Sequence, residues 1–172
     1  MIRFDRPESL AGWHAIDDAV MGGVSHSRIG YDPAGHAVFS GIVSLANNGG
    51  FASVRCRVIE PCRESIMACE LTVRGDHKTY KLSVRVGPEF DGVSYQARFQ
   101  APPGDWTRIR LQVRDFVPSW RGRSVPDAPL LDPTKVQQIG LLIADGQEGP
   151  FRLEIQSIKA SRQLAAAPKN HP

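Results

Sequence analysis

Arginine and glutamine side chains recur at alternate positions of several predicted strands in the middle of the chain. These strands place on one side Ser53, Arg55, Arg57, Thr72, Arg74, Lys81, Ser83, Arg85, Gln96, Arg98 and Gln100. A guanidinium group presents a planar fork of donors that suits carboxylates, carbonyls and phosphates. If the strands are neighbours in one sheet, these side chains form a broad cationic face. Such a face is either a binding surface for a ligand or protein, or the ordinary solvated side of a half-exposed sheet.

Other residues that could support catalysis lack a partner at a suitable spacing. Asp17 and Asp18 are adjacent, and adjacent residues of an extended segment point apart, which disfavours a catalytic carboxylate pair. The same loop offers too few oxygens to indicate a calcium site, so loop capping is the favoured role of both residues. Ser25 and His26 are neighbours in sequence, which does not place a nucleophile against a base. The chain also has no P-loop, dinucleotide fingerprint or H-E-x-x-H motif, so we expect no catalytic residues and no cofactor.

Composition and charge narrow the class of protein further. The three cysteines, Cys56, Cys62 and Cys69, form no C-x-x-C pair, so we expect reduced thiols and no metal site. The net charge of +3 is too small to indicate a nucleic-acid partner. The apolar run Ile139–Ala144 is too short to cross a bilayer, and the N-terminus carries no apolar leader. These features predict a soluble cytoplasmic protein that does not insert into membranes.

The segment that would organise the fold is Asn47-Asn48-Gly49-Gly50. Asn and Gly adopt positive φ most readily, as tight reversals require. Predicted strands flank the segment at 38–45 and 51–58. We therefore expect a hairpin of these two strands, with Arg55 pointing away from the apolar side.

Strict alternation of apolar and polar residues predicts the other strands. Further strands are expected at 2–4, 13–16, 24–29, 66–74, 79–86, 93–100, 106–113, 136–144 and 151–160. In the last strand the apolar positions shift by one residue between Ile155 and Ile158, which predicts a β-bulge. About ten short strands predict an all-β protein, an antiparallel β-sandwich with jelly-roll topology. We expect one domain over residues 1–160 and a disordered tail over 161–172.

A long segment, 115–133, is expected to be a loop, and loops of this length are usually functional or packed by their own side chains. It contains Trp120, Arg121 and Arg123. Trp120 and Trp106 could also serve as stacking platforms for a sugar, although buried aromatic rings are the commoner case.

The ordered set of motifs resembles the complex I intermediate-associated protein 30 family. The motifs lie at 18–25, 39–41, 47–55, 74–76, 94–97, 106, 121–123, 139–143 and 149–155. The resemblance implies a galactose-binding-like β-sandwich similar to family 11 carbohydrate-binding modules. It also implies a chaperone-like role in the assembly of respiratory complex I (NADH:ubiquinone oxidoreductase), and it carries over no catalytic residues.

Our leading hypothesis is a non-enzymatic protein-binding sandwich whose partners are subunits or intermediates of complex I. The candidate binding residues are Asn47, Asn48, Arg55, Arg85, Gln96, Arg98, Trp120, Arg121 and Arg123. The first alternative is a carbohydrate-binding module that uses the polar sheet face. The second is an enzyme for a small polar or anionic substrate, with Arg55 and Arg98 as anion clamps.

Overall fold

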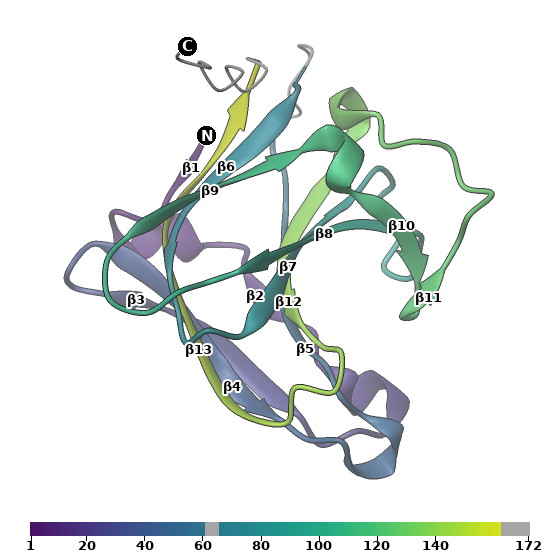
Figure 1. Cartoon of the computed structure of the whole chain (residues 1–172), viewed down its shortest axis with the longest axis horizontal. Helices are drawn as coiled ribbons and strands as arrows, with labels where there is room; N and C mark the ends of the chain where they lie inside the picture. The colour runs from purple at the N-terminus through teal and green to yellow at the C-terminus, as the bar shows by residue number, and fades with distance from the viewer. Residues whose placement is uncertain (61–65, 163–172) are drawn as a thin grey trace, which may run out of the picture.

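Two antiparallel sheets packed face to face make up the computed structural model, which describes residues 1–60 and 66–162 (Figure 1). Sheet A has the order β3 (His26–Asp32), β4 (His36–Val43), β13 (Gly149–Ser161), β6 (Ala68–Arg74) and β9 (Thr107–Gln112), and β1 (Ile2–Arg3) also pairs with β13. Sheet B has the order β11 (Arg123–Ser124), β10 (Val117–Trp120), β8 (Ser94–Gln100), β7 (Thr79–Arg85), β12 (Gln138–Ile143), β5 (Ala52–Arg57) and β2 (His14–Ala15). Short 3-10 turns lie between strands: η1 (Pro7–Leu10), η2 (Asp18–Met21), η3 (Ala46–Asn48), η4 (Val113–Asp115) and η5 (Pro133–Lys135). The predicted antiparallel β-sandwich is confirmed.

Aromatic rings from both sheets meet in the core. Phe39 and Phe151 of sheet A lie edge to face with ring centroids 4.9 Å apart, and Tyr80 of sheet B meets Phe39 at 6.4 Å. Edge-to-face pairs of this kind add about 0.5–1.5 kcal/mol each beyond the apolar area they bury. The hydroxyl of the fully buried Tyr80 donates to Asp76 at 2.9 Å, so its polar end is satisfied. Burial, followed by the charge of Asp76, raises the pKa of Tyr80.

The last strand contains the irregularity that its sequence predicts. The register between β13 and β6 shifts between Ile155 and Ser157. This shift confirms the predicted bulge, and it returns Ile158 to the buried side. β13 ends at Ser161, inside the tail expected from the sequence, and residues 163–172 lie outside the described residues.

The predicted hairpin at 47–50 is wrong. β4 belongs to sheet A, whereas β5 lies in sheet B between β12 and β2. The turn residues do adopt the expected backbone, with φ of 56° at Asn47 and 59° at Asn48. Local residue types thus set the reversal, but they do not choose the strand that β5 pairs with. The segment carries the chain from one sheet to the other.

The carboxylate of Asp18 holds this crossover in place. Asp18 is fully buried and accepts hydrogen bonds from the backbone N–H groups of Ser25 at 2.9 Å, Gly50 at 2.7 Å and Phe51 at 3.3 Å. Burial alone raises the pKa of Asp18, but the hydrogen bonds from Ser25, Gly50 and Phe51 together outweigh it, so the pKa lies below its ordinary value. One side chain therefore ties the loop after η2 to the start of β5.

Two glycines leave the room that this carboxylate needs. A Cβ atom on Gly23 would lie 2.5 Å from Oδ1 of Asp18, and one on Gly49 would lie 2.5 Å from Oδ2. Any side chain at either position would displace the carboxylate from its donors.

Asp17 performs a similar role one residue earlier. Its carboxylate accepts from the N–H of Ser27 at 2.8 Å and from the N–H of Ser53 at 3.0 Å. The capping role predicted for Asp17 and Asp18 is confirmed by these contacts.

Replacement of Asp18 by alanine should destabilise the protein. Three buried or partly buried N–H groups would lose their acceptor, and we expect a loss of about 3 kcal/mol in the free energy of unfolding. Urea unfolding monitored by tryptophan fluorescence measures this loss, and Asp105→Ala, at an exposed carboxylate, is the matched control. Equal stabilities of the two variants would contradict the role of Asp18.

The stabilisation by Asp18 should also depend on pH. Because its pKa is lowered in the folded protein, its contribution is complete above the ordinary value of 3.8 and is lost as the pH falls through the native pKa. The stability difference between wild type and Asp18→Ala should therefore be constant above about pH 5 and shrink below the ordinary value. Unfolding curves collected across this range measure it, and a difference that grows with acidification would contradict the assignment.

Candidate functional site

The outward side of sheet B gathers most of the polar residues that the sequence places on one face. The core side of these strands carries Val54, Leu141, Leu82 and Ala97, so the alternate residues point outward. We call this surface the cationic face: Arg55, Arg57, Lys81, Ser83, Arg85, Gln96, Arg98 and Gln138.

Cross-strand register places these residues in rows. Arg57 and Arg85 both pair with Gln138, which lies between them on β12. In the neighbouring row, Arg55 and Ser83 flank Gly140 in the same way. A third row runs from Ser53 across Leu142 to Lys81 and Arg98, so strand pairing brings the predicted side chains together.

Two details of the predicted face are wrong. Thr72 and Arg74 lie on β6, which belongs to sheet A. β12 instead separates β5 from β7 and adds Gln138, a residue that the sequence analysis missed. The alternation of Gln138 with the apolar Ile139 and Leu141 could have predicted that its side chain points outward.

The loop at 86–93, between β7 and β8, covers one end of the cationic face. Nη1 of Arg55 donates to the carbonyl of Phe90 at 3.0 Å, and the Phe90 ring centroid lies 5.4 Å from the guanidinium carbon. Nη1 of Arg85 donates to the carbonyl of Gly92. Nε2 of Gln138 donates to the carbonyl of Gly87 at 2.9 Å. The loop backbone is therefore fixed by side chains of the sheet below it.

The two arginines beneath this loop lie in an electrostatically unfavourable position. Burial, and then the positive charge of Arg85, lower the pKa of Arg55 to about 10, against the attraction of Asp91. Burial also lowers the pKa of Arg85, again opposed by Asp91. Both groups remain charged at neutral pH.

Arg98 and Lys81 share one carboxylate at the other end of the face. Nζ of Lys81 lies 3.0 Å from Oδ1 of Asp145, and Nη2 of Arg98 lies 3.0 Å from Oδ2. The Lys81 side chain is 11% exposed, whereas that of Arg98 is 66% exposed. Asp145 therefore pairs with a buried ammonium group and a solvated guanidinium group at the same time.

The segment expected to be a loop, 115–133, contains the strands β10 and β11. Arg121 turns the chain between them with a φ of 48°. Its guanidinium carbon lies 4.9 Å from the centroid of the Trp120 ring, and its Nε donates to Asp91 at 3.0 Å. Trp120 and Arg121 thus border the 86–93 loop, while Arg123 is exposed opposite Trp120.

Asn47 and Asn48 lie apart from this group. Both are exposed in η3, at the lower end of the molecule in Figure 1, whereas β10 and β11 lie at its right-hand side. The nine residues proposed from the sequence therefore fall into two regions. Seven belong to the cationic face and its β10–β11 edge, and the two asparagines belong to the crossover.

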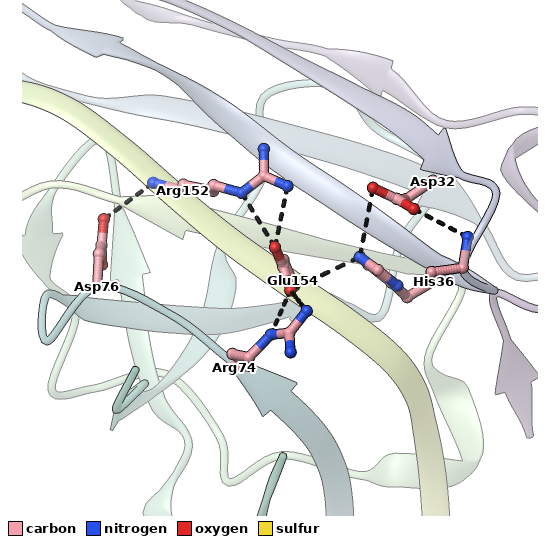
Figure 2. Close-up of polar contacts among 7 residues, drawn as sticks. Asp32, His36, Arg74, Asp76, Arg152 and Glu154 are labelled. Carbon is pink, nitrogen blue, oxygen red and sulfur yellow. Dashed lines mark hydrogen bonds and ion pairs between the residues drawn. The ribbon is translucent and has the colours of Figure 1, made fainter. Parts of the chain in front are cut away.

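Sheet A carries a second charged cluster, centred on Glu154 (Figure 2). Its Oε1 accepts from Nε of Arg152 at 3.0 Å, and its Oε2 accepts from the guanidinium of Arg74. Burial raises the pKa of Glu154, but the hydrogen bonds and charges of Arg74 and Arg152 outweigh it, so the pKa lies below its ordinary value. The buried ring of His36 adds a nitrogen 3.6 Å from Oε2. Both arginines of this cluster therefore already have a carboxylate partner.

The ring of Trp106 borders the cluster on sheet A. The guanidinium carbon of Arg74 lies 4.7 Å from its centroid, and His36 meets it edge to face at 5.2 Å. Protein side chains thus already contact the ring that the sequence offered as a sugar platform.

The described cysteines and the acidic groups add no further candidate. Cys56 and Cys69 are free thiols, and burial raises the pKa of Cys69 to about 11; Cys62 lies outside the described residues. Over residues 1–60 and 66–162, no group of three His, Cys, Asp or Glu side chains could hold a metal ion. The same ranges contain no helix with the length and apolar character needed to cross a membrane.

The shared carboxylate of Asp145 gives a test of this geometry. Asp145→Asn leaves the buried ammonium of Lys81 without its counter-charge, and we expect a loss of about 2 kcal/mol in the free energy of unfolding. Arg98→Gln removes only an exposed ion pair and should change stability by no more than about 0.5 kcal/mol. Urea unfolding of both variants compares the two effects, and equal losses would show that Lys81 does not depend on Asp145.

Comparisons with known proteins identify the fold and the family. The family 11 carbohydrate-binding module of the cellulosomal cellulase Lic26A-Cel5E of Clostridium thermocellum superposes with a TM-score of 0.69 at 14% identity, over 92% of each chain. A second structure of the Clostridium thermocellum module, in complex with a β-1,3-1,4-mixed-linked tetrasaccharide, gives a TM-score of 0.64 at 13% identity, over 87% of this chain and 88% of that one. At these identities the likeness shows the shared β-sandwich.

Comparison of the sequence identifies the family as well as the fold. The protein C9E9.15 of Schizosaccharomyces pombe is 26% identical over 197 aligned positions, which cover 100% of this chain and 86% of that protein. The profile of the complex I intermediate-associated protein 30 family matches residues 2–155, which span both sheets. The chain belongs to the complex I intermediate-associated protein 30 family.

Proposed function

We propose that this protein is a non-enzymatic, chaperone-like binding module that assists the assembly of respiratory complex I. The observation that carries the proposal is the family match over residues 2–155, because the family is described by its association with complex I intermediates. The partners are then subunits or partly assembled intermediates of that complex. The free thiols Cys56 and Cys69 suit a reducing compartment, and we place the protein in the cytoplasm.

The cationic face is the surface that we assign to the partner. Arginine and aromatic residues are enriched at protein interfaces, where they supply both fixed hydrogen bonds and apolar contact. Here the exposed side chains of Phe90, Val117 and Trp120 border the arginines of sheet B. The cluster on sheet A is a weaker candidate, because its arginines are already bound to Glu154.

A carbohydrate ligand on the same face is the second candidate. It is favoured by the structural similarity to a module solved with a tetrasaccharide. The amide of Gln96 and the exposed ring of Trp120 could in principle bind a sugar. Arg121 already stacks on Trp120, however, which leaves less of the ring for a sugar. A shared fold does not determine the ligand.

Affinity capture with defined variants tests the leading proposal. Full-length wild type should enrich complex I subunits from a lysate of the source organism, as identified by mass spectrometry. Arg55→Ala/Arg98→Ala should reduce that enrichment by about tenfold or more, because interface arginines often dominate binding energy. Arg108→Ala/Arg114→Ala removes two exposed charges away from the cationic face and is the matched control.

Thermal unfolding must show that both double variants remain folded. Equal recovery of complex I subunits by all three baits would remove the cationic face from the proposal. Failure of the wild type to enrich any complex I subunit would overturn the assembly role itself.

Calorimetric titration with a β-1,3-1,4-linked tetrasaccharide separates the two candidates. Under the leading proposal we expect no heat of binding. Binding heat that disappears in Trp120→Ala and persists in Trp106→Ala would instead establish the carbohydrate reading.

A further inference from the structure

Two half-buried arginines of the cationic face lie side by side without a carboxylate of their own. Arg55 on β5 and Arg85 on β7 are separated only by β12. β12 contributes Gly140 opposite Arg55, and a Cβ atom there would lie 3.6 Å from the Cβ of Arg55. The missing side chain leaves space in which Arg55 extends across β12, where its Nη1 lies 3.5 Å from Oε1 of Gln138.

Asp91 and Asp145 are bound to other cations, and the exposed Glu89 of the 86–93 loop forms no ion pair among the described residues. Asp91 accepts from both Nε and Nη2 of Arg121, and Asp145 is shared by Lys81 and Arg98. In the described part of the chain, no carboxylate lies within 4.0 Å of a side-chain nitrogen of Arg55 or Arg85. Their hydrogen bonds go to neutral acceptors, namely the carbonyls of Phe90 and Gly92 and the amide of Gln138.

Unused donors remain on both guanidinium groups. Each group has five N–H donors, whereas the hydrogen bonds described above come from one nitrogen of each side chain. Nε of Arg85 is buried and has no hydrogen-bond partner among the described residues. A buried donor without a partner and a guanidinium group without a bound carboxylate are both unfavourable, so an anion at this position would be stabilised by both.

The chemistry of this position favours a carboxylate presented by a protein. Guanidinium forks match the geometry of a carboxylate in paired hydrogen bonds. The exposed ring of Phe90 above Arg55 and the exposed Val117 opposite Gln96 supply apolar contacts beside the charges. This combination of a charged pair with flanking apolar groups is typical of a protein interface.

We propose that Arg55 and Arg85, with Phe90 above them, form a subsite for an acidic side chain of the protein partner. The proposal rests on the proposed function and specifies the chemistry of the partner. Arg98, which the sequence had paired with Arg55, is outside the subsite because it is already paired with Asp145.

A defined peptide tests the subsite without knowledge of the natural partner. The probe is a ten-residue peptide of alternating glutamate and glycine, and its reference has glutamine at each glutamate position. Nuclear magnetic resonance of the full chain, following the arginine Nε–H signals, measures binding. We expect the glutamate peptide to shift the signals of Arg55 and Arg85 and to bind at least about tenfold more tightly than the reference.

Matched variants separate a specific pair from general charge attraction. Arg55→Gln and Arg85→Gln should each weaken binding by about tenfold, whereas Arg108→Gln, with the same charge change at an exposed arginine of sheet A, should weaken it by less than about threefold. Arg55→Lys keeps the charge but loses the fork, so we expect an intermediate loss. Amide spectra verify that each variant is folded.

Three results would overturn the subsite. Equal weakening by Arg108→Gln would show that binding depends only on the net charge of the protein. Binding of polygalacturonate, lost in Arg55→Gln, without binding of the glutamate peptide would assign the subsite to an acidic glycan. If neither the glutamate peptide nor polygalacturonate binds, the subsite is refuted. The proposed function is tested separately, by the capture of complex I subunits.

Discussion

The buried carboxylate of Asp18 is the constraint on which the arrangement of the two sheets depends at one end of the sandwich. It binds backbone N–H groups of the loop before β3 and of the end of the passage from β4 to β5. That passage places β5 in sheet B rather than beside β4. β5 carries Arg55, which belongs to the candidate binding site. The loop contacts of Asp18 therefore help to set the position of that site, although Asp18 is not part of it.

The two outer faces of the sandwich differ in how their charges are balanced. On sheet A, Glu154 accepts from both Arg74 and Arg152, so each of these arginines already has a carboxylate partner. On sheet B, the acids Asp91 and Asp145 lie at the border and bind Arg121, Lys81 and Arg98. The half-buried Arg55 and Arg85 remain, which makes sheet B the face with unused binding capacity.

Family and fold give different information about this protein. The sandwich is shared with carbohydrate-binding modules, one of which is solved in complex with a tetrasaccharide. The family match indicates the biological setting, through its description as an associate of complex I intermediates. The ligand itself is determined by side-chain chemistry, and on sheet B that chemistry is cationic with exposed aromatic rings at its border.

The sequence by itself determined the strands other than β10 and β11, the inward and outward residues of the central strands, and the bulge of the last strand. Alternation is a local property, so β7 and β8 bury Tyr80, Leu82, Ala97 and Phe99 as expected. It also determined that Asn47 and Asn48 adopt positive φ. Only the tertiary structure decided which strands are neighbours, because pairing depends on the burial of whole sheets and on long-range contacts such as those of Asp18. For that reason Arg74 lies in sheet A, Gln138 lies between Arg57 and Arg85, and Arg55 is grouped with Arg85 rather than with Arg98.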